Sequence, residues 1–595
     1  MDLAKSWFSD ILEKKKADYW SSDMKKQRRI VYLETEYEKA LEKDGIPFFQ
    51  YPRPQLVRDS YLNLNGKWDF SVMSGGICTY EGTITVPFVP ESRISGVQKE
   101  IKRMDILVYE RRFELKNAFI KDKILLHIGA CDQCARVFVN GRFAGEHVGG
   151  YLPFTVDITD TAREGENLIR IEAVDNMDTD LPYGKQTANP GGRWYTKISG
   201  IWQSVWIESV AENYIKSIRI KTDLRGADIS VFGGEDEKIL SFEGREYRFS
   251  GNLFRLEAAE PILWSPENPK LYEFSVRSGG DEVKSYFGLR TVDIRNINGK
   301  NMMCLNGKPM FFNGLLDQGY YSDGIFLPAA ESGFEDDILK MKACGFNMLR
   351  KHIKLEPDIF YYYCDKLGML VFQDMINNGK YSFLIDTALP TIGLKKGVTH
   401  RVSDKCAREF EYTSKGIIDA LYNHPSVVYY TIFNEGWGQH DADSYYRKLK
   451  EHDDTRIYDT TSGWFLEKLS DVKSEHIYFK PIKLKNDGKR PLVLSEFGGY
   501  SYKVPDHSAN PDDNYGYKSF DSAESLECGL IELYEKQVLP AIDIGLNAAV
   551  LTQVSDVEDE TNGLLTYDRK VMKVDPDKMA ETAKKIYDRF NKLYG

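Results

Sequence analysis

The sequence predicts a multidomain protein with a charged extension, two successive β-sandwiches and a C-terminal (β/α)8 TIM barrel. Its 595 residues, 42% of them apolar, are enough for several hydrophobic cores. Short alternating runs with turn dipeptides occupy residues 51–296, which favours antiparallel sheets. From residue 297 onward, apolar runs alternate with helical segments, which is typical of a parallel sheet.

Residues 1–50 are charged and helix-leaning, and their sequence assigns them no task. Residues 51–210 form the first predicted sandwich. Two dipeptides there, Asn65-Gly66 and Asn140-Gly141, follow alternating runs, and Asn-Gly favours the positive φ angles of a type I′ hairpin. Residues 211–296 contain a further group of short strands, and their span suits a small immunoglobulin-like sandwich.

Residues 297–595 contain eight short apolar runs with helical segments between them. Their total length of about 300 residues is close to the ~250 of an eightfold βα barrel. A doubly wound open sheet is the alternative, but no Gly-x-Gly-x-x-Gly follows any run, so we prefer the barrel. The runs span residues 310–312, 347–349, 370–372, 427–433, 457–458, 476–478, 492–494 and 548–551.

The composition argues against some classes of function. The net charge is −11 and acids and bases are interspersed, so there is no basic stripe of the kind that nucleic-acid binding needs. Eight cysteines are spread along the chain, which indicates a reducing compartment rather than a disulfide scaffold. Cys131 and Cys134 have metal or redox spacing, but they lead into an alternating strand and have no second pair, so we interpret them as structural.

The sequence predicts neither a leader nor a membrane partner. The first residues contain no apolar stretch before the three lysines at 14–16, as a leader would need. No later run approaches the ~20 apolar residues of a membrane span. We therefore expect a cytoplasmic protein.

Two glutamates stand where a βα barrel carries its catalytic groups. Glu435 follows the fourth run and Glu496 the seventh, so both can face one pocket at the C-terminal ends of the strands. Taken singly, such a glutamate is more often a helix N-cap or an ion-pair partner. As a pair they suit glycoside hydrolysis, in which one carboxyl donates a proton and the other attacks or stabilises the anomeric carbon. Their separation, which the sequence does not give, decides between retention and inversion.

Four segments carry a resemblance to a known family. They are Leu62–Phe70 (LNLNGKWDF), Gly200–Trp206 (GIWQSVW), Asn434-Glu435 and Ser495–Gly498 (SEFG). In this order they resemble the retaining β-glycosidases of glycoside hydrolase family 2, which include β-galactosidases, β-glucuronidases and β-mannosidases. The first two segments resemble the beginning and end of the family's jelly-roll domain, and the resemblance covers nearly everything after residue 50.

The resemblance implies roles for three residues. Glu435 is then the general acid and base, Glu496 the nucleophile that forms a glycosyl-enzyme, and Asn434 the amide that binds the sugar 2-hydroxyl. No cofactor is required by the sequence, and a magnesium or sodium ion is implied by the family resemblance only. The expected partner is a carbohydrate substrate, and a homo-oligomer is expected because oligomers are common in the family.

Further positions match the family less tightly. His476 and Tyr478 stand in a segment like the family's sixth strand, whose tyrosine bonds the nucleophile. Arg350 and His352 resemble an arginine near the nucleophile and a histidine facing the sugar, although one residue separates them here and the family usually has two. Each residue also has a purely structural interpretation, which stays open: Arg350 as a partner in an ion pair, and His352 as a hydrogen-bonded histidine without a role in binding. Asp317, Asp374 and Trp464 are expected on loops facing the pocket, where an aromatic ring can stack on a sugar.

Departures from the family pattern bear on the sugar. Trp194 stands six residues before Gly200, where β-galactosidases and β-glucuronidases often have an aspartate. Glu560 and Asn562 stand where β-glucuronidases have an Asn-x-Lys pair, and a glutamate would repel a sugar carboxylate unless a cation elsewhere compensates. The eighth strand lacks the family's usual tryptophan, since Leu551-Thr552-Gln553 occupies that place.

Three hypotheses remain. The leading one is an exo-acting retaining β-glycosidase for neutral sugars, with β-galactosides first by family frequency alone. The second keeps the fold and takes a β-glucuronide or β-galacturonide. The third is a non-catalytic carbohydrate-binding protein, which the intact glutamate pair disfavours.

Overall fold

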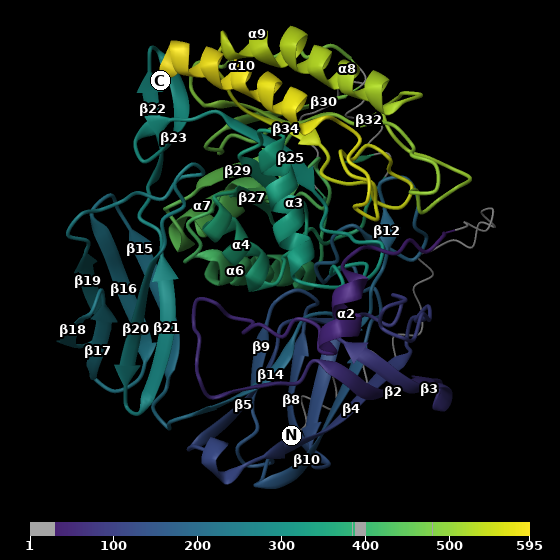
Figure 1. The fold of residues 1–595 in the computed structure, drawn as a ribbon, viewed down its shortest axis with the longest axis vertical. Coiled ribbons are helices and arrows are strands. Elements are labelled where there is room, and N and C mark those ends of the chain that lie inside the picture. Colours follow the sequence, from purple (N-terminus) through teal and green to yellow (C-terminus); the bar gives the residue numbers. More distant parts are fainter. Residues whose placement is uncertain (1–29, 383–384, 387–399, 479) are drawn as a thin grey trace.

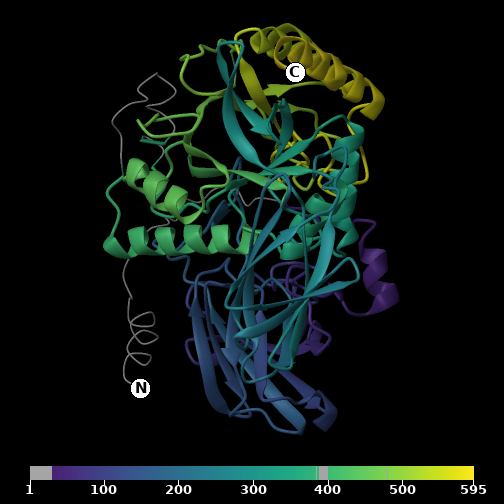
Figure 2. The ribbon, with the colours of Figure 1, turned by 90° about the vertical axis from the view of Figure 1, so that its left-hand side faces the viewer.

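The computed structural model describes residues 30–382, 385–386, 400–478 and 480–595. Three units follow one another along the chain, and the barrel lies above the first sandwich with the second sandwich beside both (Figure 1). Viewed from the side of the second sandwich, this unit stands in front of the other two (Figure 2). The predicted class of two sandwiches and a barrel is therefore confirmed.

The predicted extension is described from residue 30 onward, and its basic stretch at 14–16 lies outside the described residues. The described part holds one short helix, α2 (Glu38–Asp44). Thr35 donates a hydrogen bond of 2.5 Å to Asp323, and the Gln50 N–H donates to Glu331 at 3.3 Å. This segment thus lies against the barrel.

The first sandwich has two antiparallel sheets whose alternating apolar side chains, such as Phe70 and Ile207, meet in one core. One sheet has the order β1 (Tyr61–Asn63), β14 (Val205–Val210), β5 (Lys123–Ile128) and β9 (Phe154–Asp157). The other has the order β3 (Ile77–Val86), β2 (Gly66–Ser74), β4 (Ile106–Leu115), β10 (Gly165–Val174), β7 (Cys134–Val139) and β8 (Arg142–Val148). Smaller elements are η1 (Asn117–Phe119), β6 (Cys131–Asp132), β11 (Gln186–Thr187), β12 (Tyr195–Thr196) and β13 (Gly200–Ile201).

The two Asn-Gly dipeptides have different outcomes. Asn140 and Gly141 have φ angles of 51° and 78° and join β7 to β8, so the predicted hairpin is confirmed. The prediction at Asn65-Gly66 is wrong, because β1 and β2 belong to different sheets. The Asn65 side chain instead donates to the Phe48 carbonyl at 3.0 Å and accepts from the Val205 N–H at 3.0 Å. These bonds fix the crossing from one sheet to the other.

The second sandwich packs a three-stranded sheet against a four-stranded one around residues such as Val231 and Val276. The three-stranded sheet has the order β15 (Ile215–Thr222), β16 (Gly226–Gly233) and β19 (Leu253–Glu257). The four-stranded sheet has the order β18 (Arg245–Ser250), β17 (Glu237–Phe242), β20 (Tyr272–Ser278) and β21 (Asp281–Phe287). A small sheet of β22 (Val292–Ile297), β23 (Lys300–Leu305) and β24 (Lys308–Pro309) leads into the barrel. The predicted domain boundaries stay predictions, and the one after residue 296 falls inside β22.

Eight parallel strands form the barrel, and each overlaps one of the eight predicted runs. In sheet order they are β29 (Ile457–Ser462), β28 (Val427–Asn434), β27 (Leu370–Asp374), β26 (Met348–Lys351), β25 (Phe312–Asp317), β34 (Leu546–Thr552), β31 (Leu492–Gly498) and β30 (Lys473–Ile477). The two end strands face each other, since Ser474 of β30 donates to Asp459 of β29 at 3.0 Å. Stacked rings of Phe372 and Tyr429, with centroids 4.1 Å apart, fill part of the core.

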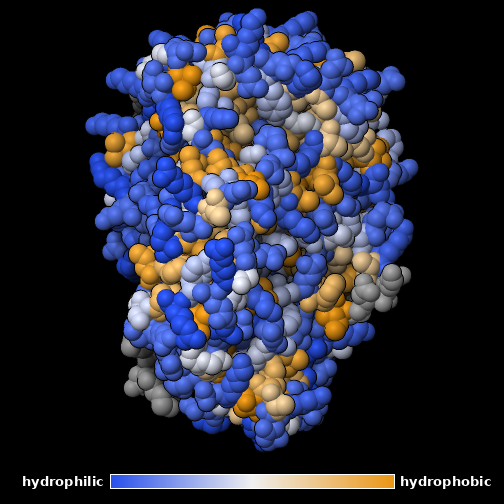
Figure 3. All heavy atoms as spheres, turned by 60° about the vertical axis from the view of Figure 1, so that its left-hand side comes forward, coloured by the Kyte–Doolittle hydropathy of each residue, from blue (hydrophilic) through white to orange (hydrophobic). Residues whose placement is uncertain are grey.

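Helices surround these strands, and α10 runs along the top of the barrel in Figure 1. They are α3 (Ser332–Ala343), α4 (Asp358–Leu367), α6 (Asp404–Leu421), α7 (Ala442–His452), α8 (Ala523–Leu533), η3 (Tyr534–Val538), α9 (Leu539–Ile542) and α10 (Pro576–Tyr594). Two short strands, β32 (Tyr500–Ser501) and β33 (Lys518–Ser519), form a separate small sheet. The visible face is mostly hydrophilic with scattered apolar residues (Figure 3). Among the described helices none is both long and apolar enough to cross a membrane.

One hydrophobic core extends from the barrel into the first sandwich. It joins Tyr151, Tyr195 and Trp202 of the sandwich to barrel residues such as Tyr320 and Phe326. Tyr195 and Tyr320 have ring centroids 4.8 Å apart, and Trp202 and Phe326 are 5.1 Å apart. The loop that precedes Tyr195 is thereby held over the barrel.

Candidate active site

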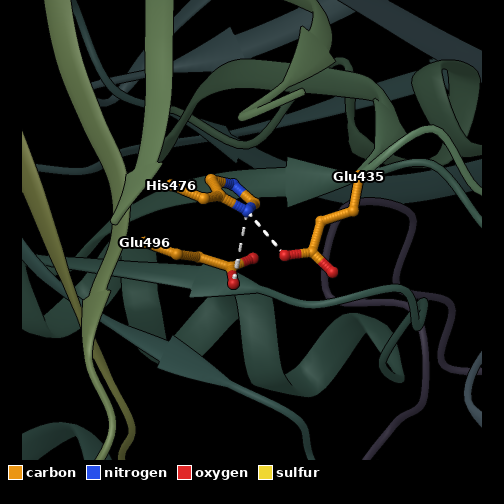
Figure 4. A group of neighbouring side chains, drawn as sticks. All are labelled: Glu435, His476 and Glu496. Carbon is orange, nitrogen blue, oxygen red and sulfur yellow. Dashed lines mark hydrogen bonds and ion pairs between the residues drawn. The ribbon is translucent and has the colours of Figure 1, made fainter. Parts of the chain in front are cut away.

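The two predicted glutamates meet at the C-terminal ends of the barrel strands. Glu435 follows β28 directly, and Glu496 lies in β31, which is on the other side of the sheet order. Their nearest carboxylate oxygens lie within 4.8 Å of each other (Figure 4). Glu435 has a φ of 53°, a conformation uncommon for residues other than glycine and found at functional sites. The chain thus turns sharply at the point where this side chain enters the pocket.

His476 of β30 stands between the two carboxylates (Figure 4). Its Nδ1 donates to Glu435 Oε1 at 3.0 Å and lies 3.5 Å from Glu496 Oε2. On the other edge of the ring, Nε2 lies 3.1 Å from the Ser462 hydroxyl. The imidazole therefore couples the two carboxylates, a position that the sequence pattern did not predict for it.

Glu496 is surrounded by donors from the barrel itself. Arg350 of β26 donates to its Oε1 at 3.0 Å, and the Tyr478 hydroxyl donates to its Oε2 at 2.8 Å. Tyr478 also contacts the Thr552 hydroxyl at 2.7 Å and stacks on Tyr517 with centroids 4.1 Å apart. This matches the geometry that the family resemblance implies for an arginine and a tyrosine beside the nucleophile, while the catalytic role stays a prediction.

Arg350 also fixes two other polar groups. Its guanidinium donates to Asp374 at 3.0 Å and to the side-chain oxygen of Asn434 at 2.9 Å. Because the oxygen of Asn434 faces the arginine, its NH2 group points away and can donate to a ligand. Arg350 is 1% exposed and so forms a buried link between Glu496 and Asn434.

Asp317 and Asp374 are not on loops as predicted, because they are the last residues of β25 and β27. Their carboxylates are paired: Asp317 accepts from Lys351 at 2.6 Å, and Asp374 accepts from His352 at 2.6 Å as well as from Arg350. Burial lowers the pKa of His352, and the bond to Asp374 opposes this. The two aspartates position neighbouring cations and the imidazole rather than facing open solvent.

Trp464 follows β29 and is partly exposed, with its ring centroid 6.3 Å from that of His476. It therefore lies close to the glutamate pair. Its predicted stacking on a sugar stays a prediction.

Two cations of the first sandwich reach the site and were missed by the sequence analysis. Arg193 donates to Glu435 Oε2 at 3.4 Å and to the Tyr381 hydroxyl at 2.9 Å. The charge of Lys185 helps to lower the pKa of Glu435, and the charges of Glu435 and Glu496 act in turn on Lys185. Neither residue has a spacing or periodicity that marks it, and the only signal was the adjacent Trp194, which departs from the family pattern. The ring of Trp194 packs edge-on against that of Trp437, with the ring centroids 4.6 Å apart.

Glu560 does not stand open toward a ligand. It is 3% exposed, and it accepts hydrogen bonds from the Tyr195 hydroxyl and, at 3.3 Å, from Gln553. Burial raises the pKa of Glu560, while the charge of Lys185 acts in the opposite direction. The repulsion of a sugar carboxylate expected from this glutamate is thus offset by hydrogen bonds and by a nearby cation.

The resting site keeps Glu435 ionised. Burial raises its pKa, but the hydrogen bond and charge of His476 and the charges of Arg193 and Lys185 outweigh burial and lower the pKa to about 2. A general acid needs the opposite shift, since it must carry a proton near neutral pH.

The same three side chains, Glu435, His476 and Glu496, offer ligand atoms within 4.8 Å of one another. A cation can bind such a set, but both carboxylates already accept bonds from His476, Arg350 or Tyr478. We therefore interpret the group as an acid–base site. The ion implied by the family resemblance stays a prediction.

Three family models match the chain. The model described as Glycosyl hydrolases family 2, sugar binding domain, matches residues 93–209. Glycosyl hydrolases family 2 matches residues 205–290, and Glycosyl hydrolases family 2, TIM barrel domain, matches residues 296–591. Together they cover both sandwiches and the barrel.

Individual relatives are distant. The chain is 26% identical over 494 residues to a β-galactosidase of Thermoanaerobacter pseudethanolicus, covering 76% of this chain and 60% of that protein. It is 23% identical over 504 residues to a β-galactosidase of Priestia megaterium, covering 77% and 46%. A solved β-D-glucuronidase of Dictyoglomus thermophilum has a TM-score of 0.69 at 20% identity, covering 91% of this chain and 99% of that one. The chain thus spans about half the length of the two β-galactosidases and shares the whole fold of the third enzyme.

Proposed function

We propose a reaction for this chain from the premise that it belongs to glycosyl hydrolase family 2. The reaction is the hydrolysis of a terminal β-linked sugar with retention of configuration, through a glycosyl-enzyme on Glu496. One observation carries the proposal: the nearest oxygens of Glu435 and Glu496 lie within 4.8 Å of each other.

The separation of the carboxylates supports retention. Retaining enzymes hold them about 5–5.5 Å apart, so that one can attack the sugar directly, whereas inverting enzymes leave about 6.5–9.5 Å for a water molecule. The observed upper limit of 4.8 Å between the two oxygens lies on the retaining side of these ranges. Direct attack by a carboxylate is therefore the favoured route.

The surroundings of each glutamate support this division of the two roles. Arg350 and Tyr478 donate to Glu496 and hold its oxygens in place, which suits the carboxylate that attacks the anomeric carbon. As that bond forms, the glycosidic bond breaks and the proton of Glu435 goes to the leaving oxygen. In the second step Glu435 takes a proton from water, the water oxygen attacks the anomeric carbon, and the bond to Glu496 breaks. We expect the NH2 group of Asn434, whose oxygen accepts from Arg350, to bind the 2-hydroxyl.

The pocket supports action at a chain end. Residues of the first sandwich, including Arg193 and Trp194, cover the side of Glu435, and Tyr517 covers the side of Tyr478. A pocket closed on two sides accepts one terminal sugar more readily than the middle of a polymer. Two named relatives favour β-galactosides as the first substrate to test. The cations Arg193 and Lys185 favour a second candidate, a β-uronide.

The decisive experiment follows the anomeric proton of the first product by NMR during hydrolysis of aryl β-glycosides (galactoside, glucoside, mannoside, glucuronide, galacturonide and arabinoside). We expect the β-anomer to appear first. A 2-deoxy-2-fluoro glycoside should add one fluorosugar to the wild type and none to Glu496→Ala, as measured by intact mass and peptide mapping. First release of the α-anomer would overturn retention, and binding without turnover or labelling would support a carbohydrate-binding protein instead.

A further inference from the structure

We propose that a row of exposed lysines on the outside of the barrel, together with the cavity at its start, binds a polysaccharide that carries sulfate or carboxylate groups. The lysine row consists of Lys480, Lys483, Lys485 and Lys489. Such a surface goes beyond the proposed glycosidase function, because it holds a sugar chain without cleaving it.

The segment that carries the lysine row connects β30 to β31 without a helix. These strands are parallel neighbours, so the chain between them must return from one end of the barrel to the other. Its residues 480–491 form neither helix nor strand. The Ile482 N–H donates to Gln537 at 2.7 Å, and the Asn486 side chain donates to the Ile544 carbonyl at 2.9 Å. The segment is thereby fixed on η3 and on the turn after α9.

The alternation of side chains directs the lysines outward. Ile482 and Leu484 are partly buried and pack against the hydrophobic core, whereas Lys483 and Lys485 are exposed. This is the pattern of an extended chain, in which residues two apart lie about 7 Å from each other. That distance is shorter than the Debye length of about 8 Å at physiological ionic strength, so the positive charges repel one another.

No acidic side chain neutralises the lysine row within the described part of the chain. Residues 480–490 hold five basic residues and one acidic residue, although the net charge of the chain is −11. The acid, Asp487, pairs with Arg490 at 2.9 Å, and no ion pair joins a lysine of the row to a described residue. Lysines on the barrel helices do pair, as Lys584 does with Asp588 at 2.6 Å. The lysine row therefore keeps its positive charge for a ligand.

A cavity of about 340 Å³ opens at the start of the lysine row, with Lys480 and Lys518 among its lining residues. The Lys518 Nζ lies 4.9 Å from the ring centroid of Tyr500 and forms no ion pair with a described residue. Gln537 also lines the cavity, and because its oxygen accepts from the Ile482 N–H, its NH2 group can donate to a ligand. Pockets for small ligands have about 300–1,000 Å³, so the cavity can hold a sugar unit whose anionic group contacts the two lysines.

The cavity adjoins the proposed active site but is separate from the glutamate pair. Tyr478 lines the cavity and donates through its hydroxyl to Glu496 at 2.8 Å, whereas neither Glu435 nor Glu496 is among the described lining residues. A chain bound here is held beside the catalytic pocket without filling it. Proteins that bind single-stranded nucleic acids stack bases on aromatic rings, and residues 480–490 contain none. A polysaccharide is therefore the polyanion that this position favours.

The test follows the fluorescence anisotropy of labelled dextran sulfate, carboxymethyl-dextran and uncharged dextran as the protein is added. Dextran is α-linked, so the proposed β-glycosidase does not consume the probes. We expect both anionic chains to bind, the uncharged chain not to bind, and the logarithm of the affinity to fall linearly with the logarithm of the salt concentration. The tighter anionic chain identifies sulfate or carboxylate as the preferred group.

The triple variant Lys480→Gln, Lys483→Gln, Lys485→Gln should weaken binding by about 10-fold or more and reduce the salt slope by about 2–3. The matched control substitutes three paired lysines by glutamine, and its affinity should change by less than about twofold. Its positions are Lys536, Lys584 and Lys585.

Lys518→Gln tests the cavity and should weaken binding by about threefold. Unchanged affinity in this variant would overturn the placement of the chain in the cavity. Absence of binding by either anionic chain at about 20 mM salt, or the same loss in both triple variants, would overturn the whole site. Tighter binding of oligodeoxythymidylate or polyglutamate of equal charge would overturn the assignment to a polysaccharide.

Hydrolysis is measured separately from binding. On a neutral aryl β-galactoside, the triple variant and the wild type should agree in kcat/KM within about twofold, because none of the three lysines belongs to the proposed catalytic site. If galactosides are hydrolysed and the anionic dextrans do not bind, the glycosidase stands and the lysine row falls. If the anionic dextrans bind and no glycoside is hydrolysed, the lysine row stands and the glycosidase falls.

Discussion

The two halves of the active site are built differently. Glu496 is 6% exposed, and its donors Arg350 and Tyr478 come from the barrel. Glu435 is 14% exposed and touches both His476 of the barrel and Arg193 of the first sandwich. The barrel alone therefore completes the side of the proposed nucleophile, whereas another domain adjusts the side of the proposed acid. This difference teaches that one glutamate is held within a single unit of the chain, whereas the surroundings of the other depend on how two units pack.

The largest expected effect tests the half that the barrel builds. Arg350→Met leaves Glu496, Asp374 and Asn434 without their shared donor, and breaking a buried ion pair costs about 3–5 kcal/mol. We expect kcat/KM to fall by about 10³-fold and the urea midpoint of unfolding to drop. Arg112→Met, which removes an exposed arginine, should change neither quantity. A stable and active Arg350→Met would show that Glu496 does not depend on this network.

A smaller effect is expected for Tyr478→Phe. The substitution removes one hydrogen bond to Glu496 and keeps the stack on Tyr517. A hydrogen bond to a charged group contributes about 1.5–3 kcal/mol, so kcat should fall by about 10–100-fold with little change in KM. Tyr412→Phe is the control, because Tyr412 is 58% exposed. A change confined to KM would indicate that Tyr478 binds the sugar rather than supporting the proposed nucleophile, Glu496.

The next prediction concerns the pH dependence of the other half. His476 donates to Glu435 and helps to lower the pKa of Glu435 to about 2. In His476→Gln this pKa should rise, so the alkaline limb of kcat/KM should move to higher pH on every substrate. Arg193→Met removes a more distant charge, 3.4 Å from Glu435, and should shift the limb in the same direction by a smaller amount. A larger shift in Arg193→Met than in His476→Gln would show that the first sandwich, rather than the barrel, dominates the pKa of Glu435.

The smallest effect is expected for Trp464→Ala. The ring is partly exposed and lies 6.3 Å from His476, where it can stack on a sugar face. Loss of an aromatic contact worth about 0.5–1.5 kcal/mol should raise KM by about 2–10-fold and leave kcat unchanged. A fall in kcat with constant KM would instead mean that Trp464 orients His476.

The sequence predicted the barrel and the glutamate pair because both depend on local patterns. Buried parallel strands are continuous apolar runs, and the polar residue that ends such a run lies at the catalytic face of a barrel. The sequence did not predict that His476 joins the two glutamates, because its contacts depend on how β28, β30 and β31 curve around one axis. It also gave Asn65-Gly66 the same meaning as Asn140-Gly141, although only the second dipeptide joins paired strands.

By itself, the sequence determined the order of the units, the eight strands and the positions of Glu435 and Glu496, since apolar periodicity and turn residues act over a few neighbours. Only the tertiary structure decided that Arg193 and Lys185 reach the barrel and that Glu560 is held by Tyr195 rather than facing a ligand. These contacts join residues more than 200 positions apart, and no local pattern encodes them. The fold brings them together because one hydrophobic core is shared between the first sandwich and the barrel.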